Sequence, residues 1–269
     1  MKFVSSLIVK FYRKAADIGH DMAQYNLGHH YANGEGVPQD YAEAVKWYRL
    51  AAEKGNVLAQ YSLGLCYEHG EGVVQNHALA AKWYRLAADQ GDHDAQNNLG
   101  NLYSEGHGVA QDYDQSFKWY QLAAQQGNAT SQCNLGLCYE KGNGVAQDYN
   151  EAIKWYGLSA KLGNRYAQFN LGSLYSAGQG TPKDDATAVI WYLKAAKQGM
   201  PEAQYNLGCS YAIGEGTMQD DVSAYMWFFL ASALGNELAR ASLAQLKETM
   251  TPKHISKAQR LGHAWKPKK

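Results

Sequence analysis

A side-chain amide recurs along this chain at a fixed spacing of 36 residues, interrupted once by a serine. An asparagine side chain both donates and accepts hydrogen bonds, so a row of them can pair with the backbone of an extended peptide whatever its sequence. The pattern predicts a partner-binding row made of Asn26, Ser62, Asn98, Asn134, Asn170 and Asn206.

Aromatic and variable residues next to this row would supply the affinity that amides lack. Asparagine contacts at about 1 kcal/mol each total about 5 kcal/mol, whereas association and ordering cost on the order of 4–15 kcal/mol. Apolar anchors must therefore contribute. We expect them among Tyr25, Tyr61, Phe169 and Tyr205, with the variable His29 and His69 alongside. The alternative is that each asparagine is architectural, bridging adjacent elements or binding water.

Residue patterns that would indicate catalysis or metal binding are absent from the sequence. No serine is followed by lysine three residues later, so the acylating S-x-x-K motif is missing. The nine histidines form no H-E-x-x-H or other ligand spacing, and the four cysteines match no zinc or disulfide framework. We predict a non-catalytic protein with no cofactor, no metal and reduced cysteines.

The elements that must position these residues are two helices in each 36-residue unit. In the first helix, Ala23, Leu27 and Tyr31 recur at helical spacing and form one apolar stripe. A G-x-G segment then breaks the helix, and because it follows a predicted helix in every unit it is a turn rather than a phosphate loop. Asp40 and Glu43 predict a capping box at the start of the second helix, whose apolar face includes Trp-Tyr and Ala-Ala pairs.

These residues resemble the Sel-one-like repeat family, a branch of the tetratricopeptide-type helical repeats. The matching pattern is A-x-x-x-L-G-x-x-Y-x-x-G-x-G-V-x-x-D-x-x-x-A-x-x-W-Y-x-x-A-A-x-x-G, with departures that include Ser116, Ser131 and Phe228. The resemblance implies an all-α, right-handed α-α superhelical solenoid with first helices on its concave side. It also implies a scaffold for protein–protein interactions, and a role for the asparagine before Leu-Gly in holding peptide backbone.

The family also has members discussed as β-lactam-binding proteins, so an enzyme acting on a cell-wall or β-lactam-like substrate is the alternative function. Those relatives resemble disulfide-stapled repeats with a cysteine in each helix of the hairpin. No second helix contains cysteine in this sequence. The chemistry therefore favours the scaffold.

The repeat register predicts three segments. Residues 1–22 form an N-terminal half repeat with a lone second helix, and residues 23–236 form six repeats. Residues 237–269 form a seventh first helix and a C-terminal capping helix that begins at Thr251-Pro252.

The outward face of the second helices becomes apolar toward the C-terminus. Ile190, Leu193, Met226 and Phe229 replace the charged residues of earlier repeats. We expect the final helix to cover Met226 and Phe229 through its own stripe of Ile255, Ala258, Leu261 and Trp265. Ile190 and Leu193 would remain as a patch on the convex face for a partner, a weak homodimer or an assembly role.

Charge and hydrophobicity narrow the choice of partner. The formal net charge is zero, so neither nucleic acid nor an acidic membrane has bulk electrostatic support. No apolar run approaches the length of a membrane span. We therefore expect a bacterial-type protein that binds a protein or peptide as a monomer or weak homodimer. A cytoplasmic location is expected, with the periplasm or secretion as the alternative if a leader precedes this sequence.

Overall fold

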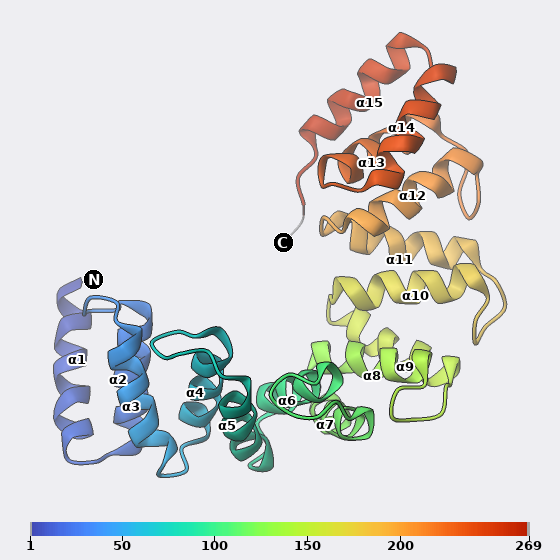
Figure 1. Ribbon diagram of the computed structural model, residues 1–269. Coiled ribbons are helices and arrows are strands. Elements are labelled where there is room, and N and C mark those ends of the chain that lie inside the picture. The colour runs from blue at the N-terminus through green and yellow to red at the C-terminus, as the bar shows by residue number, and fades with distance from the viewer. Residues whose placement is uncertain (1, 268–269) are drawn as a thin grey trace. The chain divides into compact units, whose positions relative to one another are not determined.

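The computed structural model describes residues 2–267, and every regular element within that range is an α-helix (Figure 1). The described residues form fifteen helices: α1 (Lys2–Asp17), α2 (Asp21–Asn33), α3 (Tyr41–Ala52), α4 (Val57–His69), α5 (His77–Asp89), α6 (His93–Glu105), α7 (Tyr113–Gln125), α8 (Ala129–Lys141), α9 (Tyr149–Lys161), α10 (Arg165–Ala177), α11 (Asp185–Lys197), α12 (Pro201–Ile213), α13 (Asp221–Ala233), α14 (Glu237–Thr249) and α15 (Pro252–Ala264). The prediction of an all-α chain built from 36-residue hairpins is confirmed.

The chain divides into two compact units. Unit 1 contains the residues up to Ser131 together with Asn143–Val145. Unit 2 contains Gln132–Gly142 together with the residues from Ala146 onward. In both, even-numbered helices are the first helices of repeats and odd-numbered helices are the second helices.

Capping residues set the ends of each helix. At the start of α3, Asp40 Oδ1 accepts a hydrogen bond from the Glu43 backbone N–H at 2.9 Å. The second half of the expected capping box is missing, because the Glu43 carboxylate accepts instead from Lys46 Nζ at 2.8 Å and Trp47 Nε1 at 3.1 Å. At the other end of the first helix, Gly34 ends α2 in the left-handed region at φ 69°.

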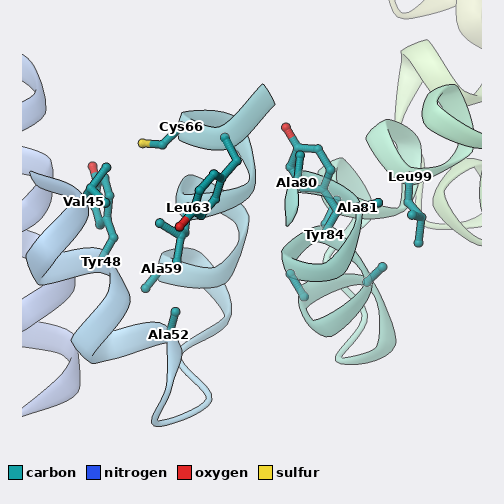
Figure 2. Packing of buried hydrophobic residues seen from close by; sticks show 14 of the residues in the cluster. Val45, Tyr48, Ala52, Ala59, Leu63, Cys66, Ala80, Ala81, Tyr84 and Leu99 are labelled. Carbon is teal, nitrogen blue, oxygen red and sulfur yellow. The ribbon is translucent and has the colours of Figure 1, made fainter. Parts of the chain in front are cut away.

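A glycine notch in the first helix of each of the six full repeats receives the aromatic ring of its partner helix. A Cβ atom added to Gly28 would lie 2.7 Å from Tyr48 Cδ1, and one added to Gly64 would lie 2.5 Å from Tyr84 Cδ1. Both rings are buried, and Figure 2 shows them on either side of Leu63 in the core of unit 1. Glycine at this position therefore allows the two helices of a hairpin to pack closely.

The G-x-G turn joins one repeat to the one before it. Gly72 has φ +70°, and a Cβ atom there would lie 2.3 Å from the carbonyl carbon of Tyr41 at the start of α3. The second glycine of the turn thus lies directly against backbone of the preceding repeat. This contact explains why the turn needs glycine for space as well as for its dihedral angle.

A buried glutamine in the first helix of each of the six full repeats makes a further link to the preceding repeat. Gln60 Nε2 donates to the Ala52 carbonyl oxygen at 3.1 Å, near the end of α3. Gln60 Oε1 in turn accepts from Gln90 Nε2 at 2.8 Å, after α5. Equivalent bonds join Gln96 to Ala88 and Gln126, and Gln168 to Ala160 and Gln198. This glutamine row is an architectural device.

Candidate functional site

The predicted asparagine row lies on the first helices at the edge of the core. Asn26, Ser62 and Asn98 lie on α2, α4 and α6 of unit 1, and Asn134, Asn170 and Asn206 lie on α8, α10 and α12 of unit 2. All six side chains are half-buried. These six side chains are therefore less exposed than side chains on the helix face opposite the core would be.

The environment of Asn98 explains this partial burial. Its amide lies beside the phenols of Tyr61, on the preceding first helix, and Tyr84, on the preceding second helix, and its Oδ1 accepts a hydrogen bond from Asn97 Nδ2 at 3.3 Å. Burial, with Asp94 and Asp92 nearby, raises the pKa of Tyr61 to about 12, although the neighbouring Asn98 amide acts in the opposite direction.

Other members of the row differ in their contacts. Asn170 lies beside the phenol of Tyr156, and Ser62 lies beside the phenols of Tyr25 and Tyr48. Within residues 2–267, the side chains of Asn26 and Asn206 form no hydrogen bond with another side chain. The row therefore places its polar groups beside the phenols of neighbouring helices.

The predicted aromatic anchors are half-buried and lie against rings of their own hairpins. Ring centroids are 5.9 Å apart for Tyr25 and Tyr48, and 5.8 Å apart for Tyr61 and Tyr84. In unit 2 the corresponding distances are 5.9 Å for Phe169–Tyr192 and 5.8 Å for Tyr205–Phe228. One part of each ring stabilises the hairpin, and the rest lies open beside the asparagine row.

The two predicted histidines lie further toward solvent. Both His29 and His69 are exposed. The Nδ2 atom of Asn33, one helical turn later, lies 3.0 Å from His29 Nε2 and forms a hydrogen bond with it. They stand on the variable positions of the first helices. Such positions suit contacts that select side chains rather than contacts that hold backbone.

Hydrogen bonds from the hydroxyl groups of the buried tyrosines form a second polar feature, which the sequence pattern did not reveal. Tyr156 donates to Glu140 Oε2 at 2.7 Å, and Tyr84 donates to the equivalent Glu68. Tyr120 donates instead to Asn101 Oδ1 at 2.7 Å. The acceptor comes from one of two positions on the first helix, 16 or 19 residues before the tyrosine.

The apolar positions of the later second helices fall into two groups. Met226 and Phe229 on α13 are half-buried, and α15 packs over this part of the helix. Gly262 lies against the Phe229 ring, and the ring centroids of Trp265 and Trp227 are 6.2 Å apart. On α11, Leu193 is half-buried within the core cluster of unit 2, and Ile190 is 54% exposed.

The inner stripe of the final helix differs in part from the expected one. Ile255 and Ala258 pack against α13, but Leu261 is 40% exposed. Gly262 takes the inward position because only a residue without a side chain fits beneath the Phe229 ring. Trp265 follows the end of α15 rather than lying within the helix.

The cysteines are free thiols with little nucleophilic character. Burial raises the pKa of Cys66, Cys133 and Cys138 to about 12, so these groups are protonated at neutral pH. Among residues 2–267, no three His, Cys, Asp or Glu side chains gather as a metal site. In the same range no helix has the length and apolar character to cross a membrane.

The repeat pattern identifies the family. The profile described as Sel1 repeat matches seven consecutive segments: residues 9–20, 21–56, 57–92, 93–128, 129–164, 165–200 and 201–236. The chain belongs to the Sel1 repeat family. This confirms the resemblance seen in the sequence, and the Sel1 repeat protein has a helical solenoid fold of the kind typical of protein-interaction scaffolds.

Solved structures of Sel1 repeat proteins are similar in sequence and fold. A protective antigen of uropathogenic Escherichia coli strains, which displays an SLR fold, is 37% identical with a TM-score of 0.87 over 94% of this chain. This Sel1 repeat chain spans 54% of the length of that protein. A Sel1 repeat protein from Oxalobacter formigenes is 36% identical with a TM-score of 0.73, covering 79% of this chain and 85% of its own. No curated protein matches the chain.

Proposed function

We propose that this Sel1 repeat protein binds an extended, uncharged peptide segment of a protein partner along the asparagine row of its first helices. The supporting observation is an amide that follows a partly open aromatic ring on three first helices, at Tyr25-Asn26, Phe169-Asn170 and Tyr205-Asn206. An amide bonded to one phenol keeps further donors and acceptors, because it carries two N–H groups and two lone pairs. Asn206 and Asn26 retain all of theirs.

The glutamine row supports a binding role for the asparagines. If the asparagines were constant only because repeats must be bridged, they would duplicate a task that the buried glutamines perform. Gln60, for example, holds both the end of α3 and the segment after α5. The asparagine position is thus free to serve a second purpose.

Charge supports a neutral rather than an acidic ligand. The row Asn26, Ser62, Asn98, Asn134, Asn170 and Asn206 contains no lysine or arginine. Recognition of carboxylate groups in proteins relies on such cations, with arginine favoured for its paired donors. Backbone amides and apolar side chains are the ligand groups that these residues match.

A library of unstructured peptides, displayed and selected on the intact protein, would test this proposal. The affinity of a selected peptide would be measured by isothermal titration calorimetry for the native protein and for N170A/N206A. Two lost hydrogen bonds at about 0.5–1.5 kcal/mol each total about 1–3 kcal/mol, which predicts a weakening of about 5- to 150-fold.

The matched control is N150A, which removes an exposed asparagine at the start of α9, outside the row. It should leave the affinity unchanged. If N170A/N206A also keeps its affinity, while its melting temperature falls, the row is architectural and the proposal fails.

A further inference from the structure

An open cavity of about 430 Å³ lies between α12 and α13 of the last full repeat and α14, which follows it. The ring of Phe228 forms its floor, and Ala212, Ile213 and Leu246 line its walls. All of these helices belong to unit 2. The volume lies within the range of about 300–1,000 Å³ that is typical of ligand pockets.

Departures from the repeat pattern explain why a cavity lies here. In the fourth repeat the equivalent ring is Tyr156, whose hydroxyl donates to Glu140 at 2.7 Å. In the sixth repeat the ring is Phe228 and the residue 16 positions earlier is Ala212, so both the hydroxyl and the carboxylate are missing. Apolar space replaces a hydrogen-bonded pair.

Uncharged polar groups surround this space. Cys209, Ser242, Gln245 and Thr249 complete the lining, and none of these side chains is charged at neutral pH. The phenol of Tyr205 lies at the edge, within hydrogen-bonding reach of Cys209 and Ser242. A charged group entering the cavity would lose water without gaining a partner, which is costly.

The cavity lies beside an unpaired member of the asparagine row. Asn206 precedes Cys209 by three residues on α12, so the two side chains lie on the same face of the helix. Within the described part of the chain the Asn206 side chain makes no hydrogen bond. An amide able to hold peptide backbone therefore stands next to a cavity able to hold a side chain.

We propose that this cavity is the anchor pocket for one uncharged, apolar side chain, of leucine or phenylalanine size, from the extended peptide segment whose backbone Asn206 holds. This inference rests on the proposed function and adds selectivity for one peptide side chain at the C-terminal end of the asparagine row. The occupant is a peptide residue because the apolar walls and the adjacent free amide match the two halves of such a residue, its side chain and its backbone.

The test uses single capped amino acids as probes of the intact protein. N-acetyl-leucinamide and N-acetyl-phenylalaninamide are compared with N-acetyl-lysinamide and N-acetyl-glutamic acid amide. Chemical shifts of the Ile213 methyl groups report occupancy, since Ile213 lines the wall. We expect saturable shifts with the two apolar probes and at least tenfold weaker binding of the charged ones. Equal responses to all four probes, or none to the apolar pair, would overturn the proposal.

Two variants fill the cavity in different ways. A212E/F228Y rebuilds the pair that Glu140 and Tyr156 form in the fourth repeat, and A212L fills the space with apolar atoms alone. Both should weaken the apolar probes at least tenfold while circular dichroism shows native helix content. Probe binding that persists in both folded variants would place the site elsewhere and refute the inference.

The reverse substitution provides a gain-of-binding control. E140A/Y156F removes the hydrogen-bonded pair in the fourth repeat and should create a second site for the apolar probes, seen as a doubled stoichiometry. Capped residues are too short to span the asparagine row. Failure of the pocket therefore appears in these titrations, whereas failure of the proposed function appears in the affinity of N170A/N206A for a selected peptide.

Discussion

Two amides on α6 allow architecture and binding to be separated within a single helix. Gln96 is buried, donates to the Ala88 carbonyl oxygen at 3.1 Å and accepts from Gln126 Nε2 at 2.8 Å. Asn98, two residues later, is half-buried beside the phenols of Tyr61 and Tyr84. The matched substitutions are Gln96→Ala and Asn98→Ala.

The expected magnitudes follow from these contacts. Gln96→Ala removes two hydrogen bonds and leaves a carbonyl near the end of α5 and the Gln126 amide without their partner. At about 0.5–1.5 kcal/mol per bond, the free energy of unfolding should fall by about 1–3 kcal/mol. Asn98→Ala exposes its phenol neighbours to water, which can replace the lost bonds, so it should cost about 1 kcal/mol or less.

Urea unfolding followed by circular dichroism measures both changes, and titration with a selected peptide measures binding. We expect Gln96→Ala to lower stability and leave the affinity of the folded protein unchanged. Asn98→Ala should weaken peptide binding and change stability little. The pair Gln168 and Asn170 on α10 repeats the comparison in unit 2. A larger stability loss from Asn98→Ala than from Gln96→Ala would refute the division between the two rows.

Three further predictions concern stability. Ser116→Ala should raise the free energy of unfolding by about 1 kcal/mol in urea titrations, because the buried Ser116 hydroxyl has no hydrogen-bond partner. The free energy of unfolding should fall as pH rises from about 9 toward 12. Burial raises the pKa of the Cys66 thiol and the Tyr61 phenol to about 12 in the folded protein, whereas the same groups in the unfolded chain lose their protons at lower pH. Equal free energies of unfolding from urea titrations at pH 7.5 and pH 11 would contradict this. Removing the chain from Thr251 onward should uncover Phe229 and cost about 3 kcal/mol or more, or cause aggregation, as checked by thermal melting and light scattering; a monomer of unchanged stability would argue against the cap.

The repeat register could be predicted from the sequence because each signal recurs and each copy supports the others. Asp40 and Gly34, for example, mark helix boundaries through local chemistry: Asp40 caps the start of α3 and Gly34 ends α2, as expected. Leu261 shows where such reasoning fails. It lies on the predicted stripe, but the bulk of the Phe229 ring admits only Gly262 at the closest approach.

Contacts between residues that depart from the repeat pattern could be found only in the structure. Ser131 replaces an alanine and Asn97 replaces an aromatic residue, and each substitution alone looks like a weakened copy. In the fold the Ser131 hydroxyl donates to Asn97 Oδ1 at 2.9 Å in the core, so the two changes belong together. Phe228 likewise stands out in the sequence, but the cavity above it depends on Ala212 and on side chains from α14.

The links between repeats have a consequence for how the chain folds during synthesis. The bond from Gln90 to the Gly55 carbonyl spans 35 residues, and so does the bond from Gln198 to the Gly163 carbonyl. A ribosome adds about 5–20 residues per second, so the partner of a finished hairpin emerges about 2–7 s later. Helical proteins dominated by such local contacts fold in microseconds to milliseconds. Each hairpin can therefore dock on its predecessor before the next one leaves the ribosome, and the growing chain exposes little more than one unpaired hairpin at a time.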